Sequence, residues 1–330
     1  EGIKGVPKAY LLTDILKDSA GALEVVDLCK GAPKFSNSLL LEEVGTETLD
    51  TKIRALRDDK PLKRKELLGT IFPDLIAFQS AATTRYQTAR EHGNGFGQLI
   101  EERPIGVKIL DYLRAILNFD HVADLPQEVV TLTAPAIKSL EASYQAGTPS
   151  ICHGDAIPPN IIIGKDGEKY FIDPQPKSRD PITDASSLIA APGVLLSLGD
   201  KEELARQFRL EHLRSMGASA RGLTGRLTLD EPGERALRNA LYSRLVQYSA
   251  RNLGIITDLV RQLPGAYRGD PTDDAEEMRN NLMSSLTALV GQPEKCGLTQ
   301  EAASAYDAFH RVLRDGGVFS PKEAQVVASV

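Results

Sequence analysis

Hydrophobic and polar positions divide the 330-residue chain into two stretches of different periodicity. Before residue 45, short apolar runs at residues 6–12, 22–28 and 38–44 are separated by Gly, Pro, Asp and Ser, which is typical of strands joined by turns. From Leu49 onward, apolar residues recur mainly at helical spacing. The pattern therefore predicts a small antiparallel sheet followed by a much larger helical region.

Pro and Gly punctuate the helical region and set the expected limits of its helices. The expected helices cover residues 62–85, 104–119, 133–145, 180–188, 201–216, 232–263, 271–290 and 300–313. Within the sixth of these, one apolar face comprises Leu237, Leu241, Leu245 and Tyr248. The Gly-rich residues 90–102 do not lead from a strand into a helix, so we expect a flexible connection there and not a phosphate-binding loop.

Residues 151–176, ICHGDAIPPNIIIGKDGEKYFIDPQP, interrupt the helical pattern. Two apolar runs flank a polar turn that contains two Gly residues, which predicts a β-hairpin. Asp155 and Asn160 precede its first strand, and Asp173 ends its second. Three oxygen-bearing side chains at one end of a hairpin suit Mg²⁺ and an attacking hydroxyl, although an ordinary hairpin with Asx-type turns has the same composition.

The same segment carries a family resemblance. The motif HGD, four residues, N, and then ID with its Asp thirteen positions after the Asn, resembles the catalytic core of the aminoglycoside phosphotransferases, distant relatives of protein kinases. The continuation DPQP, DP and a further Asp is most similar to the branch that contains the streptomycin-type phosphotransferases. The resemblance implies that Asp155 is the catalytic base and that Asn160 and Asp173 hold Mg²⁺ on the phosphates of ATP. It also implies that His153 and Asp184 support the catalytic loop.

The resemblance extends weakly to the start of the chain. Residues 39–45, LLLEEVG, are similar to the family's hinge, where the Glu42 carbonyl would accept from the adenine amino group and the Val44 amide would donate to the ring. The implied fold is α/β (α+β): a protein-kinase-like two-lobed fold. Residues 1–45 would form a partial N-terminal nucleotide-binding lobe with the hinge, and residues 46–330 a helical C-terminal lobe that carries the catalytic hairpin.

Kinase-like phosphotransfer also needs a Lys on an early strand to hold the ATP phosphates. The opening residues resemble the family's segment just after the helix that follows this strand, so Lys4 and Lys8 come too late to serve. We therefore expect the printed chain to lack several N-terminal strands and a helix, and to bind ATP poorly as it stands.

Composition excludes several other classes. A hydrophobic content of 42% with 25% charged residues is typical of a soluble globular protein, and a net charge of −6 argues against a nucleic-acid partner bound through phosphates. The three cysteines are odd in number and irregularly spaced, which favours a reduced, cytoplasmic setting. No apolar stretch is long enough to span a membrane. The oligomeric state is left open.

The sequence favours an enzyme that moves the γ-phosphoryl group of ATP to a hydroxyl of a small molecule such as an aminoglycoside or amino sugar. A non-catalytic nucleotide-binding regulatory module of the same fold is the first alternative, and a helical interaction protein with an incidental hairpin is the second. The acidic residues 269–277 form a helix start or a binding site for ammonium groups. Beyond residue 191 no motif identifies the acceptor.

Overall fold

The computed structural model describes the chain in segments. They comprise residues 9–11, 39–41, 47–56, 61–91, 105–145, 150–165, 167–175, 177–217, 228–263, 267 and 270–315. Glu42 and Val44, the expected adenine-binding residues, lie outside these segments, as does the expected strand at residues 22–28. The hinge therefore stays a prediction.

The described protein is mostly helical, with small antiparallel sheets. Its α-helices are α3 (Leu49–Ala55), α4 (Pro61–Gly69), α5 (Phe72–Glu91), α6 (Ile105–Ile116), α7 (Gln127–Gln145), α8 (Ile182–Ala190), α9 (Leu198–Ser215), α10 (Glu231–Gln262), α11 (Pro271–Gly291) and α12 (Gln300–Asp315). Its strands are β1 (Ala9–Leu11), β2 (Leu39–Leu41), β3 (Glu47–Thr48), β4 (Ser150–Cys152), β5 (Ile161–Ile163), β6 (Lys169–Phe171) and β7 (Lys177–Arg179). Strands before residue 45 and helices after residue 49 follow the division that the hydrophobic pattern predicts.

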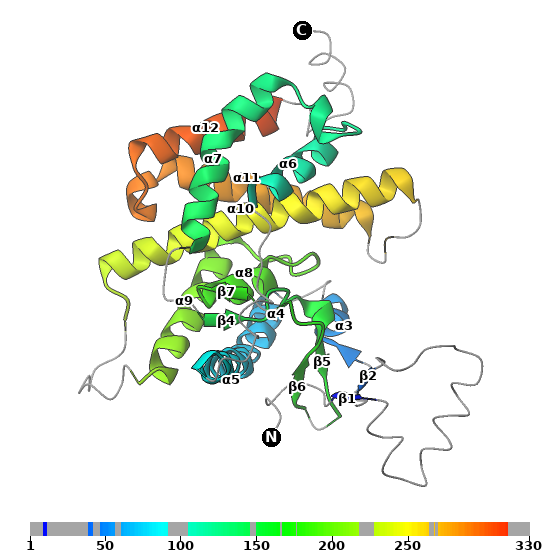
Figure 1. The fold of residues 1–330 in the computed structure, drawn as a ribbon, viewed down its shortest axis with the longest axis vertical. Coiled ribbons are helices and arrows are strands. Elements are labelled where there is room, and N and C mark those ends of the chain that lie inside the picture. Colours follow the sequence, from blue (N-terminus) through cyan, green and yellow to red (C-terminus); the bar gives the residue numbers. More distant parts are fainter. Residues whose placement is uncertain are drawn as a thin grey trace.

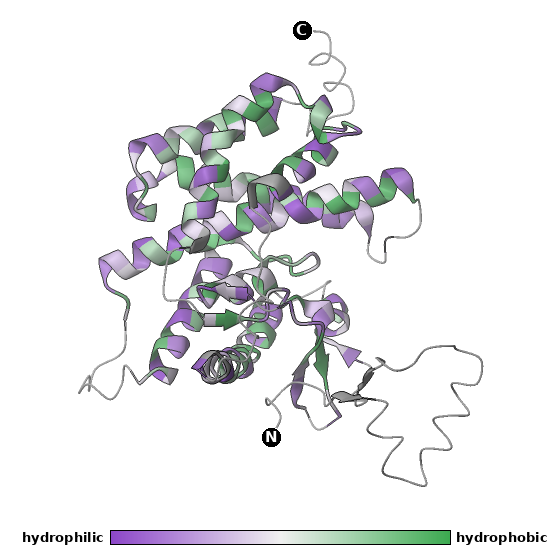
Figure 2. Ribbon diagram, in the orientation of Figure 1, coloured by the Kyte–Doolittle hydropathy of each residue, from purple (hydrophilic) through white to green (hydrophobic). Residues whose placement is uncertain are grey.

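Helix α10 is the central element of the helical region. In Figure 1 it crosses the molecule in yellow, with α6, α7, α11 and α12 on one side and α8, α9, α5 and the β4–β7 pair on the other. Its predicted apolar face is confirmed, since Leu237, Leu241, Leu245 and Tyr248 are all buried in one continuous core. Figure 2 shows hydrophobic and hydrophilic residues interleaved along this helix, as expected for a helix with both buried and exposed positions.

The strands form separate small sheets, all antiparallel. The predicted hairpin is confirmed: β5 pairs with β6, with Ile162 opposite Tyr170. Strand β3 extends this sheet along β5, and β4 pairs with β7 so that Ile151 lies opposite Ser178. Strand β1 pairs with β2. The hairpin and the β4–β7 pair enclose the segment that carries the HGD motif.

Two expected helix limits are wrong. The helix expected over residues 62–85 is two helices, α4 and α5, because Pro73 has no N–H to donate to the carbonyl of Gly69. Helix α7 begins at Gln127 and not at residue 133. Its first turns contain Val129 and Val130, β-branched residues that weaken a helix prediction, and Pro135 lies inside the helix.

The acidic segment before α11 is a helix start. Asp270 is the N-cap, and its carboxylate accepts hydrogen bonds from the amides of Thr272 and Asp273 at 2.9 and 3.1 Å. Asp274 points inward instead: it is 1% exposed and accepts from Arg54 at 3.3 Å and from Tyr267 at 2.9 Å. The segment thus caps the start of α11 through Asp270 and supplies a buried hydrogen-bond acceptor through Asp274.

Among the helices that the structure describes, none combines the length and apolar character needed to cross a membrane.

Candidate active site

The HGD segment follows β4 and crosses close to the residues that precede β7. Gly154 has φ +85°, and a Cβ atom there would lie 1.8 Å from the carbonyl oxygen of Gln175. The Gln175 amide donates to the His153 carbonyl at 2.8 Å, which holds the two segments together. Only glycine permits both this φ and this approach, so the middle residue of the motif is fixed by backbone packing.

Asp155 and Asn160 form one hydrogen-bonded unit at the end of the loop. The Asn160 amide Nδ2 donates to the backbone carbonyl of Asp155 at 3.0 Å and to its Oδ2 at 3.1 Å. Pro158–Asn160 is a 3₁₀ turn that leads directly into β5. Asp155 is 7% exposed, so its carboxylate lies in a largely enclosed position with a fixed orientation.

Asp173 lies at the same end of the hairpin as Asn160. The Ile172 amide donates to the Asn160 carbonyl at 3.0 Å, which brings the end of the second strand beside the start of the first. Asp173 has φ +52°, a left-handed conformation that is uncommon for non-glycine residues, although Asp and Asn adopt it more readily than most. Its side chain is exposed. Such backbone outliers concentrate at functional sites, where the surrounding structure holds them.

Asp184, in the first turn of α8, binds the backbone of the loop through hydrogen bonds. It is fully buried, and its carboxylate accepts from the His153 amide at 2.6 Å and from the Gly154 amide at 2.9 Å. Gln79 on α5 donates to the same carboxylate at 2.9 Å and to the Pro181 carbonyl at 3.1 Å. Two backbone donors of the loop are therefore satisfied by a buried charge.

His153 is also fully buried, and its ring lies beside two phenylalanines. The ring centroids are 5.5 Å from Phe78 and 6.1 Å from Phe171. Burial lowers the pKa of His153, although the nearby carboxylates of Asp184 and Asp155 oppose the shift. The ring also takes part in the fold of the loop, because the Asp155 amide donates to its Nδ1 at 3.4 Å.

The structure adds one residue that the sequence motif does not contain. Arg251 on α10 donates from Nη1 to Asp155 Oδ1 at 3.2 Å, across 96 residues of chain. The pattern of α10 held a signal for it, because Arg244, Tyr248 and Arg251 follow the buried face at spacings of four and three. Charged residues on an apolar stripe mark a position where the helix meets a polar site.

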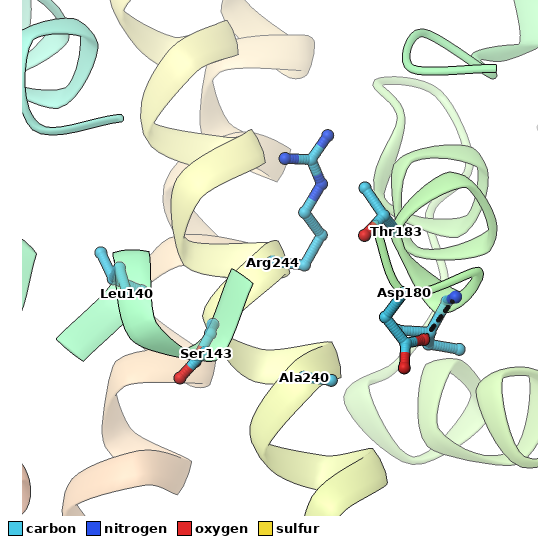
Figure 3. A pocket seen from close by; sticks show the side chains of 8 residues that line it. Leu140, Ser143, Asp180, Thr183, Ala240 and Arg244 are labelled. Atoms are coloured by element: carbon cyan, nitrogen blue, oxygen red, sulfur yellow. Dashed lines mark hydrogen bonds between the residues drawn. The ribbon is translucent and has the colours of Figure 1, made fainter. Parts of the chain in front are cut away.

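Arg244 is the second of these arginines. It is 9% exposed, donates to Ser187 at 3.1 Å, and burial lowers its pKa to about 10, so it remains charged at neutral pH. It lies at a pocket between α7, α8 and α10 (Figure 3). The pocket has room for little more than one water molecule, and Asp155 does not line it, so we do not assign it to an acceptor.

In the described ranges, no group of three or more His, Cys, Asp or Glu side chains is arranged to hold a metal ion. The expected Mg²⁺ ligands are a different set, an amide and one carboxylate, and their assignment stays a prediction.

Comparison with protein-family models and with curated protein sequences gives no match. Among solved structures, the chain is similar to a choline/ethanolamine kinase family protein from Mesorhizobium loti, with 15% sequence identity over 83% of this chain and 74% of that chain. The TM-score of this pair is 0.40. A likeness at this level assigns neither fold nor function, so the function must be argued from the residues of the chain.

Proposed function

We propose that this protein is a kinase-like enzyme that transfers the γ-phosphoryl group of ATP, with Mg²⁺, to a hydroxyl group of a small molecule. The observation that supports it is the arrangement of Asp155 and Asn160, hydrogen-bonded to each other on one loop, at the same end of the hairpin as Asp173. Phosphoryl transfer needs accurate positioning and charge neutralisation more than covalent chemistry. The hydrogen bonds at the hairpin end support the positioning, and Mg²⁺ bound there would neutralise the charge.

Asp155 has the contacts expected of a base that takes the proton from the hydroxyl of the small-molecule substrate. Each carboxylate oxygen accepts one side-chain hydrogen bond, Oδ2 from Asn160 and Oδ1 from Arg251, and each keeps a further lone-pair direction for the acceptor hydroxyl. The acceptor oxygen forms a bond to the γ-phosphorus while the bond from that phosphorus to the β–γ bridging oxygen breaks. The hydroxyl proton passes to Asp155, and ADP leaves.

The donor set at the hairpin end fits Mg²⁺. The Asn160 amide nitrogen is committed to Asp155, which leaves its oxygen available, and no described residue donates to that oxygen. Asp173 follows Ile172, whose amide donates to the Asn160 carbonyl, and its carboxylate is exposed. Hard oxygen donors of this kind suit Mg²⁺ bound to a nucleotide. Bound there, the ion would neutralise charge on the phosphates.

The test separates chemistry from nucleotide binding. We expect Asp155→Asn to lower phosphate transfer at least about a hundredfold, because it removes the proton acceptor, while Mg-ATP affinity stays within about threefold of wild type. Asp173→Ala should weaken Mg-ATP binding itself. Asp230→Asn, at an exposed helix N-cap, is the control and should change neither.

Transfer is measured with radiolabelled ATP across aminoglycosides, amino sugars, choline, homoserine, D-glycerate and D-glucuronate. A wild-type rate in Asp155→Asn would contradict the assignment of the base. Binding of Mg-ATP with no transfer to any acceptor would favour the alternative of a regulatory module.

A further inference from the structure

Arg251 uses only a fraction of its hydrogen-bonding capacity. Its Nη1 donates to Asp155 Oδ1 at 3.2 Å, and its other N–H groups donate to none of the described residues. The Arg251 side chain is 36% exposed, whereas that of Asp155 is 10% exposed. The guanidinium therefore contacts one oxygen of the carboxylate, is partly exposed, and has donors left for a further partner.

Two other arginines of the chain use both arms of the guanidinium. Arg114 binds both oxygens of Asp258, at 3.1 and 2.7 Å, and Arg206 binds both oxygens of Glu234, at 2.7 and 2.9 Å. These forked pairs are what a structural arginine forms with a carboxylate. A single bond of 3.2 Å leaves the fork of Arg251 free to take a second oxyanion.

Arg251 and Asn160 bind different oxygens of Asp155. Asn160, an expected Mg²⁺ ligand, binds Oδ2, whereas Arg251 binds Oδ1. A hydroxyl acceptor must reach Asp155 without displacing Asn160 from Oδ2, so we expect it to bind at Oδ1, the oxygen that Arg251 contacts.

We propose that Arg251 binds the acceptor, and that the acceptor is an anion: a small hydroxyl compound with a carboxylate or phosphate group close to the hydroxyl that is phosphorylated. This inference rests on the proposed function and names its substrate class. An ammonium group in the same place would face the guanidinium, and placing two like charges next to each other is costly. The structure therefore favours an acidic acceptor over the polycationic aminoglycosides that the sequence motif suggests.

A charge-graded acceptor panel tests the proposal. One series is D-glucosamine, D-glucose and D-glucuronate, and the other is serinol, glycerol, D-glycerate and glycerol 3-phosphate. We expect kcat/KM to rise by at least about tenfold from the neutral to the anionic member of a series, because a hydrogen bond to a charged group contributes about that factor. Comparison of D-glycerate with glycerol 3-phosphate distinguishes a carboxylate from a phosphate.

Variants at Arg251 show whether this residue is the cause. Arg251→Gln should remove the anion preference, so that the ratio of kcat/KM for the anionic and neutral members falls toward one, and Arg251→Lys should keep some of it. The ratio is compared within each variant, which cancels any general loss of rate from a displaced Asp155. Binding of D-glycerate and glycerol 3-phosphate without ATP, measured by calorimetry, should weaken by the same factor.

Arg261→Gln is the matched control. Arg261 is on the same helix with a side chain 32% exposed, makes single bonds to Asp120 and Asp258, and lies about 15 Å farther along the axis. It should leave the ratio unchanged. A preference for the cationic members, an unchanged ratio in Arg251→Gln, or a loss of Mg-ATP affinity in that variant would overturn the inference while leaving phosphotransfer intact. Absence of transfer to every member by protein that binds Mg-ATP would overturn the proposed function and this inference with it.

Discussion

Two glycines of the site region share a positive φ and differ in the space around them. Gly154 has φ +85° and Gly167 has φ +83°. A Cβ atom at Gly154 would lie 1.8 Å from the Gln175 carbonyl oxygen, whereas one at Gly167, in the turn of the hairpin, would have no heavy atom within 4 Å. Substitution of each by Ala therefore separates the cost of the conformation from the cost of the contact.

The expected magnitudes follow from these distances. In Gly167→Ala, a left-handed alanine costs about 1–2 kcal/mol, and the smaller entropy of the unfolded chain offsets about half of this, so a net loss of about 1 kcal/mol is expected. Gly154→Ala carries the same cost and must also move the two backbone segments apart by roughly 1.5 Å to reach normal contact, which adds about 2–3 kcal/mol. The expected total is about 3–4 kcal/mol.

The assay is equilibrium unfolding in urea followed by far-UV circular dichroism, because the chain has no tryptophan. Since Gly154 precedes Asp155 directly, Gly154→Ala should also lower phosphate transfer in the folded protein, whereas Gly167→Ala should not. Equal unfolding midpoints for the two variants would refute the reasoning, since the close approach to Gln175 would then carry no cost.

Two further predictions concern buried charges. Asp184→Asn should destabilise the protein by about 3–5 kcal/mol, because one buried donor loses its acceptor and the remaining hydrogen bonds lose their charge. Hydrogen exchange at the amides of the loop should accelerate. The control Asp230→Asn, at an exposed helix N-cap, should change stability by less than about 0.5 kcal/mol. Burial lowers the pKa of Lys201 to about 8 from 10.5, so between these values the unfolded chain holds more protons and stability rises with pH. In urea titrations, the free energy of unfolding of wild type relative to Lys201→Met should thus rise by about 2 kcal/mol from pH 7 to pH 9.5. No such rise is expected relative to the exposed control Lys138→Met. A difference between wild type and Lys201→Met that does not change with pH would contradict the burial of Lys201 as a charged group.

Local pattern was sufficient for most of the elements. The hairpin at β5 and β6 and the limits of α8 to α12 follow from periodicity and from Pro and Gly, which act over a few residues. The errors lie where local signals conflict: Pro73 splits an apolar stripe that continues across it, and Pro135 stands inside a helix. In both places tertiary packing decides which signal prevails.

Sequence pattern likewise predicted the part of the site that is close in sequence and missed the contacts between distant residues. Asp155, Asn160 and Asp173 are close in sequence, so a motif could place them at one end of a hairpin, although their chemical roles stay predictions. Gln79 reaches Asp184 across 105 residues and Arg251 reaches Asp155 across 96, and no local periodicity fixes such pairs. They depend on how α5 and α10 pack, which a single sequence does not specify residue by residue.

The contacts that hold the catalytic segment also differ in what they can do. Asp184 satisfies two backbone donors and Gln79, and it is fully buried, so its contribution is the same whatever molecule occupies the site. Arg251 contacts the segment through one N–H group, and its other N–H groups donate to none of the described residues. Loss of Asp184 should therefore lower transfer to all acceptors by one factor, whereas loss of Arg251 should change the ratio between acceptors. Different side chains thus support the loop and select the substrate in this proposal. The ratio of kcat/KM between two acceptors separates these roles, whereas the rate with a single acceptor does not.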